Sequence, residues 1–294
     1  WLQMTNMISY QGLVRTFPYL AHIMRQRGPD TRFVFMDTGA EHPATYQFIR
    51  DAVKHWGIEL VCLRVVVNTE LGKGNGYRVV PLDEIGPDLT PWIEMLRKYG
   101  TPYVGGEFCT DRMKLGPFKK YCDEHIGRKA YHTWIGIRAD EPKRLIQKPR
   151  TSYLADIDGI DKQGVIDWWA NQPFDLQIPE HLGNCVFCIK KSIQKIALAV
   201  KDEPDLAAQF SRMLCAEYVR KMPNRKGTDL VMYRGKNTFD GIIKKFAGDS
   251  RDELAARMPS QKQNPLRAFN RTALSFDKTG AMPEWYYEGG YDLI

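Results

Sequence analysis

The first part of the chain alternates short apolar runs with stretches of helical periodicity. Residues 7–10, 32–36 and 59–67 are predicted to be strands, and the second is almost continuously apolar. Such a run is typical of a strand covered on both faces. Leu20, Ile23 and Met24 recur at helical spacing before the Gly28–Pro29 stop, and a second helix is predicted over 44–56. Strands that alternate with helices predict an α/β fold with a doubly wound, mostly parallel sheet.

The pattern changes toward the C-terminus. Residues 68–106 are less regular, with a glycine-containing loop at 72–76 and a short helix at 91–99. A further strand is predicted at 129–137, a linker or lid at 147–160 and helices at 162–171, 189–200 and 204–221. We therefore divide the chain into a nucleotide-binding α/β domain (1–145) and a helical, cysteine-containing subdomain with a C-terminal tail (146–294).

Ligands of such sheets bind beyond the carboxyl ends of the strands. The segments 9–15 and 37–41 follow the first two strands and are expected on one rim. Arg138 and Arg144 follow the strand at 129–137, where arginine is suited to contact an anionic ligand. The alternative is that these arginines pair with the neighbouring Asp140 and Glu141.

Charge and composition narrow the class of protein. The 294 residues include 42 Lys and Arg against 35 Asp and Glu, a formal charge of +7, which favours an anionic partner such as a nucleotide or nucleic acid. The sequence has no apolar run of about 18 residues, so we expect no membrane span. Six cysteines are too few for a disulfide scaffold, and without an export signal we expect a reducing cytoplasm.

Two cysteines stand three residues apart in Leu182–Lys191, at the predicted start of a helix. Cys185 and Cys188 can reach one metal ion or iron–sulfur cluster, act as a redox dithiol, or form a turn with two reduced thiols. Cys109 precedes a basic helix, whose first amides should favour a thiolate. Cys62, inside a valine-rich strand, is predicted to be a core residue.

Four segments, 35–45, 109–117, 136–144 and 185–188, together resemble the phosphoadenylyl-sulfate (PAPS) reductase family of the adenine-nucleotide α-hydrolase (PP-loop) superfamily. The resemblance implies a PP-loop α/β sheet that binds ATP or an adenylyl sulfate at its rim. It also implies, as in several branches, a four-iron cluster (4Fe-4S) on cysteines, for which zinc is the alternative.

The resemblance assigns residues by position. Asp37, Thr38 and Glu41 would line the nucleotide site, and Arg138 and Arg144 would contact phosphate or sulfate oxygens. Cys109, Cys185 and Cys188 would be metal ligands. The fourth would be Cys215 or Cys122, with Cys215 favoured.

The chain departs from the family pattern in two places. The family's phosphate loop reads roughly Ser-x-Gly-Gly-x-x-Ser; here Ser9 and Gly12 match, Gln11 replaces the first glycine, and Arg15 and Thr16 could partly substitute for the last serine. The second departure is the nucleophilic cysteine of true sulfonucleotide reductases, because no cysteine follows Cys215.

Three functions are compatible with these features. The first is a PP-loop enzyme for adenylylation-dependent sulfur transfer, with nucleic acid or a sulfur-donor protein as partner. The second is a sulfonucleotide (APS/PAPS) reductase that releases sulfite. The third is a non-catalytic module that keeps the fold and the cluster and binds nucleotide or nucleic acid.

Overall fold

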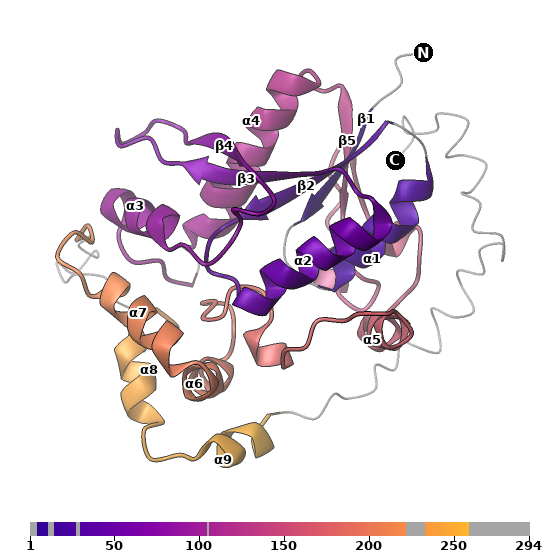
Figure 1. Ribbon diagram of the computed structural model, residues 1–294. Helices are drawn as coiled ribbons and strands as arrows, with labels where there is room; N and C mark the ends of the chain where they lie inside the picture. Colours follow the sequence, from indigo (N-terminus) through magenta and orange to yellow (C-terminus); the bar gives the residue numbers. More distant parts are fainter. Residues whose placement is uncertain (1–4, 11–14, 28–29, 105, 222–232, 259–294) are drawn as a thin grey trace.

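The computed structural model describes residues 5–10, 15–27, 30–104, 106–221 and 233–258 (Figure 1). A six-stranded sheet has the order β4-β3-β2-β1-β5-β6 and is parallel except for β4. The strands are β1 (Thr5–Tyr10), β2 (Thr31–Asp37), β3 (Leu60–Val66), β4 (Gly76–Val80), β5 (Tyr131–Ile135) and β6 (Thr151–Tyr153). The sheet confirms the α/β fold predicted from the alternation of strands and helices.

Helices cover both faces of the sheet and form a further layer beside it. They are α1 (Thr16–Met24), α2 (Pro43–Trp56), α3 (Thr90–Tyr99), the π-helix η2 (Cys109–Leu115), α4 (Gly116–His125), α5 (Lys162–Ala170), α6 (Ile193–Asp202), α7 (Pro204–Leu214), α8 (Phe239–Lys245) and α9 (Arg251–Ala256). Short 3-10 turns are η1 (Arg25–Arg27), η3 (Pro142–Arg144), η4 (Leu154–Asp156) and η5 (Glu180–Leu182). None of the described helices is long and apolar enough to cross a bilayer.

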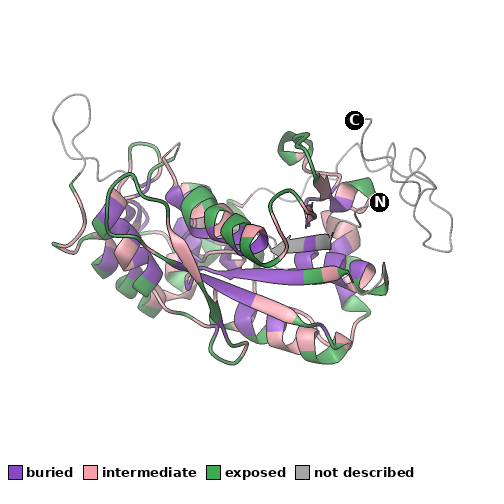
Figure 2. Ribbon diagram, turned by 90° about the horizontal axis from the view of Figure 1, so that it is seen from above, coloured by how far each residue is buried: buried purple, intermediate pink, exposed green. Residues whose placement is uncertain are grey.

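Alternate residues of β2 show why its sequence is apolar throughout. Phe33 and Phe35 pack into the cluster that includes α1 and α2, whereas Val34 and Met36 pack into the cluster that includes α4. Both faces of the strand are therefore removed from water, as its apolar run predicts. Figure 2 shows the strands largely buried and exposed residues on the outer sides of the helices.

The C-terminal helices share a core with the carboxyl side of the sheet. This core joins Val65 of β3 and Trp92 of α3 to the aromatic side chains of Phe187, Phe210 and Phe239. Figure 1 shows α6, α7 and α8 stacked beside α3. The expected division of the chain at residue 145 stays a prediction, and the sheet itself continues to β6 beyond that point.

Several expected elements differ in detail. The loop expected at 72–76 leads directly into β4, an antiparallel edge strand whose Arg78 and Val79 are exposed, so its sequence lacks a buried pattern. The expected linker at 147–160 contains β6, which pairs with β5. The helix expected from 189 begins at Ile193, after the Ser192 cap, and the helix expected to reach 221 ends at Leu214.

Helix α5 ties the sheet to the start of α1 through Trp169. This fully buried residue packs on Phe48, and its indole N–H donates to the carbonyl oxygen of Arg15 at 2.9 Å. Trp168 and Trp169 lie edge to face in the same aromatic cluster, so both side chains serve packing.

We predict that Trp169→Phe lowers the free energy of unfolding by about 1–3 kcal/mol, because a buried carbonyl loses its donor. Trp169→Ala should cost about 3–5 kcal/mol, because it also leaves a cavity. Ile146→Ala, at a residue that is 57% exposed, is the control and should change the value by about 0.5 kcal/mol or less. Urea unfolding measures all three, and equal effects of the Trp169 variants and the control would contradict the account.

Candidate functional site

The loop that follows β2 is built from its own polar contacts. We call residues 38–42 the rim loop. Gly39 has φ +73°, and its N–H donates to Asp37 Oδ1 at 2.9 Å. Thr38 Oγ1 donates to the Glu41 carboxylate at 2.8 Å, and the His42 side chain accepts from the Ala44 N–H to cap α2. The three predicted rim residues Asp37, Thr38 and Glu41 are thus held together and buried.

A buried arginine holds the first carboxylate. Arg64 of β3 pairs with Asp37, with Nε at 3.0 Å from Oδ2, and its Nη1 lies 2.5 Å from Asp88. Burial raises the pKa of Asp37, and the charge of Glu41 acts in the same direction, while Arg64 opposes both. The Tyr46 hydroxyl lies 3.2 Å from Asp37 and 3.1 Å from Glu41, so its single proton lies between two carboxylates.

The segment 185–188, which we call the cysteine turn, packs directly on the rim loop. Cys185 forms an antiparallel bridge with Glu41, and the Val186 N–H donates to the Ala40 carbonyl at 3.0 Å. Cys185 Sγ lies 3.7 Å from both Glu41 Oε1 and Thr38 Oγ1. The predicted nucleotide rim and the predicted metal ligands are therefore parts of one site.

Lys191 fixes the conformation of the cysteine turn. Its Nζ donates to the carbonyl oxygens of His181 at 2.6 Å, Cys185 at 2.9 Å and Val186 at 2.9 Å. All three ammonium protons are used in this way. Burial lowers the pKa of Lys191 to about 8, although the charges of Cys188 and Cys185 oppose that shift.

Cys109, in η2, and Lys114 both interact electrostatically with the cysteine turn. The charges of Cys188 and Cys109 act on Cys185, and that of Cys188 acts on Cys109. Lys114 leaves 13% of its side chain exposed and has its Nζ 3.8 Å from Glu41. Burial alone would lower the pKa of Lys114, but Cys185, Glu41, Cys109 and Cys188 outweigh it and raise the pKa, so the ammonium stays charged.

The helix amides favour a Cys109 thiolate as expected, but burial outweighs them. Burial raises the pKa of the Cys109 thiol, and Cys188 adds to the rise, while Lys114 and the Thr110 N–H only partly oppose it. Burial also raises the pKa of Cys185, and the negative charge of Glu41 raises it further. Desolvation of a thiolate outweighs a single turn of helix amides.

The charges at this site suit a metal–thiolate group with a net negative charge, although the described side chains are not arranged as a metal site. No set of three or more described His, Cys, Asp or Glu residues is arranged to hold a metal ion. The charges of Cys109, Cys185 and Cys188 nevertheless act on the ammonium of Lys114, whose Nζ lies 3.8 Å from Glu41. A metal–thiolate group would be balanced by that charge, so the donor set fits, and the ligand role stays a prediction.

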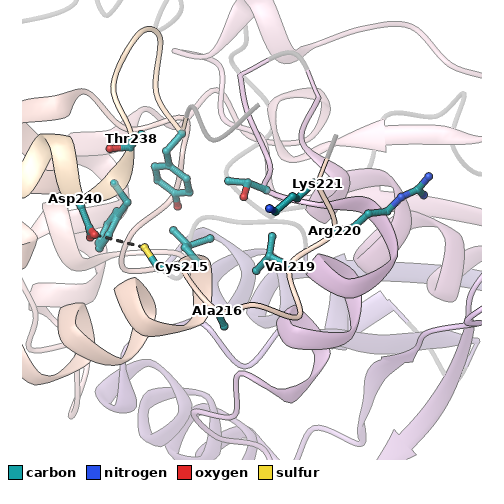
Figure 3. A pocket seen from close by; sticks show the side chains of 11 residues that line it. Cys215, Ala216, Val219, Arg220, Lys221, Thr238 and Asp240 are labelled. Atoms are coloured by element: carbon teal, nitrogen blue, oxygen red, sulfur yellow. Dashed lines mark hydrogen bonds between the residues drawn. The ribbon is translucent and has the colours of Figure 1, made fainter. Parts of the chain in front are cut away.

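Cys215 and Cys122 have other neighbours. Cys215, at the end of α7, lies 3.4 Å from Asp240, and Figure 3 shows the two facing each other in a cavity of about 380 Å³. Burial raises the pKa of Cys215, with Asp240 and Ser211 as the other groups acting on it. Cys122 is fully buried in the cluster under α4. The fourth ligand therefore stays a prediction, and neither residue shares the contacts of Cys109. Cys62 is a core residue, as expected.

The predicted phosphate-contacting cations are already paired. Arg15 binds Asp175, with Nε at 2.7 Å, and donates to the Leu176 carbonyl. Arg138 pairs with Asp140 at 2.8 Å and lies 3.5 Å from the buried Thr16 hydroxyl. Arg144 pairs with Glu141. The alternative expectation, that the arginines of 138–144 pair with neighbouring carboxylates, therefore describes this loop. Gly12 and the side chain of Ser9 lie outside the described residues.

Comparisons with known proteins place the chain in a family. A model of the phosphoadenosine phosphosulfate reductase domain matches residues 18–172. The chain is also 52% identical over 266 residues, 88% of its own length and 91% of the relative's, to an uncharacterized nin region protein of Escherichia phage lambda. The chain belongs to the phosphoadenosine phosphosulfate reductase domain family. An uncharacterized protein of Methanocaldococcus jannaschii is 26% identical over 144 residues, 49% of this chain and 25% of that protein.

Several residues of the site were not predicted from the sequence. Tyr46, Arg64, Lys191 and Tyr233 were not predicted, yet each contacts a predicted residue or the cysteine turn. Arg64 carried a signal, since it is a charged residue inside an otherwise apolar strand. Tyr233 is buried, and its hydroxyl donates to the Phe187 carbonyl in the cysteine turn, but no local pattern links the two segments.

We predict that Gly39→Ala disrupts the rim loop. A Cβ at Gly39 would lie 1.8 Å from the Asp88 carbonyl oxygen, whereas one at Gly57, also at positive φ, would meet nothing within 4 Å. Gly57→Ala should therefore cost only the backbone strain, about 1–2 kcal/mol, and Gly39→Ala about 3 kcal/mol or more. Urea unfolding of both variants checks this, and equal losses would contradict the close approach.

We predict that Lys191→Met loosens the cysteine turn. Three buried carbonyls lose their donor, so stability should fall by about 3 kcal/mol and thiol labelling of Cys185 and Cys188 should become faster. Lys190→Met is the matched control, because Lys190 pairs with Glu107 and is 56% exposed. The control should change stability by about 1 kcal/mol or less. Unchanged labelling in Lys191→Met would contradict the role of this lysine.

Proposed function

We propose that this chain binds an adenine nucleotide at the carboxyl edge of the sheet and an iron–sulfur cluster on Cys109, Cys185 and Cys188. Its activity would be adenylylation-dependent sulfur transfer to an acceptor such as a nucleic acid. The observation that carries the proposal is the contact between the cysteine turn and the rim loop, where Cys185 bridges Glu41 and Lys114 pairs with the same carboxylate. Sulfur chemistry and nucleotide chemistry would then share one pocket wall.

The chain's own residues would bind, orient and exclude water. Asp37 and Glu41 are buried and held by Arg64, Tyr46 and Lys114, so they would fix the rim loop against which a nucleotide binds. A cavity of about 130 Å³ between the rim loop and the cysteine turn adjoins Glu41 and Val186. When bound, a cluster held by three cysteines supplies an iron atom that can carry a sulfur ligand.

The reaction would have two displacements. An acceptor oxygen would attack the α-phosphorus of ATP, with pyrophosphate as the leaving group. A sulfide-class nucleophile would then attack the activated acceptor carbon and displace AMP. Arg15 and Arg138 would have to exchange Asp175 and Asp140 for phosphate oxygens, which suits the planar guanidinium.

A second candidate is a non-catalytic module that binds a nucleotide or nucleic acid. The favouring observation is that Arg15, Arg138 and Arg144 are already neutralised by carboxylates. A phosphate must compete with those ion pairs, which weakens binding at the altered phosphate loop. Sulfite release from an adenylyl sulfate would instead indicate a sulfonucleotide reductase.

We predict that anaerobically purified protein contains iron and acid-labile sulfide and shows a thiolate-to-iron absorption band. Serine at Cys109, Cys185 or Cys188 should abolish or strongly reduce the iron content. Cys62→Ala is the control and should retain the iron. Whichever of Cys215→Ser and Cys122→Ala loses iron identifies the fourth ligand. Zinc in place of iron would revise the cofactor, and metal-free protein with unaffected folding would contradict the cluster.

Turnover is measured on the same preparation with ATP, sulfide and candidate nucleic-acid acceptors. Pyrophosphate release that requires an acceptor supports sulfur transfer. Nucleotide binding without any release would favour the non-catalytic module, and sulfite formed from adenylyl sulfate with thioredoxin would favour the reductase.

A further inference from the structure

The opposite edge of the sheet carries cations that form no salt bridge with any carboxylate of the described residues. The strand register sets Thr31 and Tyr131 beside the first residues of β1, and Thr151 beside Thr133. The segments that lead into β2, β5 and β6 therefore share one edge, which we call the amino edge. Its exposed cations are Arg25, Arg32, Arg128, Lys129, Lys148 and Arg150.

The pairing of charges distinguishes the two edges. At the carboxyl edge, Arg15, Arg64 and Arg138 each bind a carboxylate. Within the described ranges, no salt bridge involves any cation of the amino edge, although the exposed carboxylates of Asp30 and Glu59 lie in the same segments. Arg25 donates to the His22 carbonyl oxygen and Arg32 bonds to Tyr121, but neither contact neutralises the positive charge. Like charges that no carboxylate neutralises repel one another, so a polyanion would gain from binding there.

Two of these cations occupy unfavourable backbone positions. Lys129 has φ +66° and Arg150 has φ +54°, and the only other non-glycine residue with positive φ in the described chain is Asn184. The left-handed conformation costs about 1–2 kcal/mol for most L-residues, and glycine or asparagine adopts it more readily. A charged side chain at both positions is therefore not explained by the local fold.

A polar cavity adjoins the amino edge. It has a volume of about 670 Å³, and its lining includes Arg25, Arg32, Trp56, Glu59 and Tyr121. The Arg25 guanidinium lies 5.9 Å from the Trp56 ring centroid. Thr31 also lines the cavity, and its buried hydroxyl has no hydrogen-bond partner among the described residues. An aromatic wall between cations and free polar groups suits an unstacked nucleobase.

We propose that the amino edge binds single-stranded nucleic acid. Phosphates would follow the cations from β2 to β6, across about 14 Å at the usual strand spacing, and one base would enter the cavity beside Trp56. The surface lies about a strand length, roughly 20 Å, from the carboxyl edge. It does not depend on the chemistry proposed there.

The test is fluorescence anisotropy with labelled RNA and DNA strands of about 20 nucleotides and the matching duplex, without ATP or sulfide. The variant is Arg128→Gln/Lys129→Asn/Arg150→Asn, since asparagine suits positive φ and should leave stability equal or higher. The matched control is Lys236→Gln/Lys244→Gln/Lys245→Gln, which removes the same charge from exposed positions near and within α8.

Loss of three phosphate contacts should reduce the slope of log K against log salt by about 2 and weaken binding about 100-fold at 0.1 M salt. The control should bind like the unmodified protein. Tighter binding of RNA or of DNA identifies which strand is preferred, and either supports the proposal. It is overturned if neither single strand binds, if variant and control lose affinity equally, or if the duplex binds as tightly as the strands.

Photo-crosslinking tests the base cavity separately. Strands that carry a thio-substituted pyrimidine should crosslink to peptides that contain residues 25–32 or 56–59. Crosslinks confined to residues 15–16 or 138–144 would show that the strand binds at the carboxyl edge and would overturn the assignment.

Discussion

The site depends on a buried ammonium group that holds together segments remote in sequence. Lys114 extends from η2 toward Glu41 of the rim loop and toward the sulfurs of Cys109 and the cysteine turn. An isolated buried charge is costly, so the chain must keep anionic or polarizable groups around it. The rim loop and the cysteine turn, 144 residues apart at Glu41 and Cys185, supply such groups and pack directly on each other through a backbone bridge.

The surroundings of this lysine are made rigid by backbone contacts. Gly39 lets the rim loop pass against the Asp88 carbonyl, and Arg64 fixes Asp37 from the neighbouring strand. Lys191 uses all its protons on the carbonyls around the cysteine turn. The sulfur positions are thus set before any ligand binds, which is the condition for a preorganised site.

The sequence predicted the parts of the fold that are buried on both faces. The apolar run of β2 and the valine-rich β3 could be found because their environment is uniform, whereas β4 was missed because its exposed edge residues lack such a pattern. Asp37, Thr38 and Glu41 were found through their resemblance to a family motif and do lie together. The ion pairs of Arg15 with Asp175 and of Arg64 with Asp37 depend on tertiary packing, and no local pattern specifies which carboxylate an arginine meets. The predicted thiolate at Cys109 was outweighed by burial, which its neighbours in the sequence do not reveal.

The two edges of the sheet differ in how their charges are neutralised. The central claim concerns the carboxyl edge, where Cys185 and Lys114 meet at Glu41 and Cys109 acts on both. X-ray absorption at the iron edge of anaerobically prepared protein tests that claim most directly. The account predicts a shell of sulfur neighbours at about 2.3 Å that is diminished in Cys109→Ser as well as in Cys185→Ser. Iron surrounded only by oxygen and nitrogen, or a sulfur shell indifferent to Cys109, would contradict it.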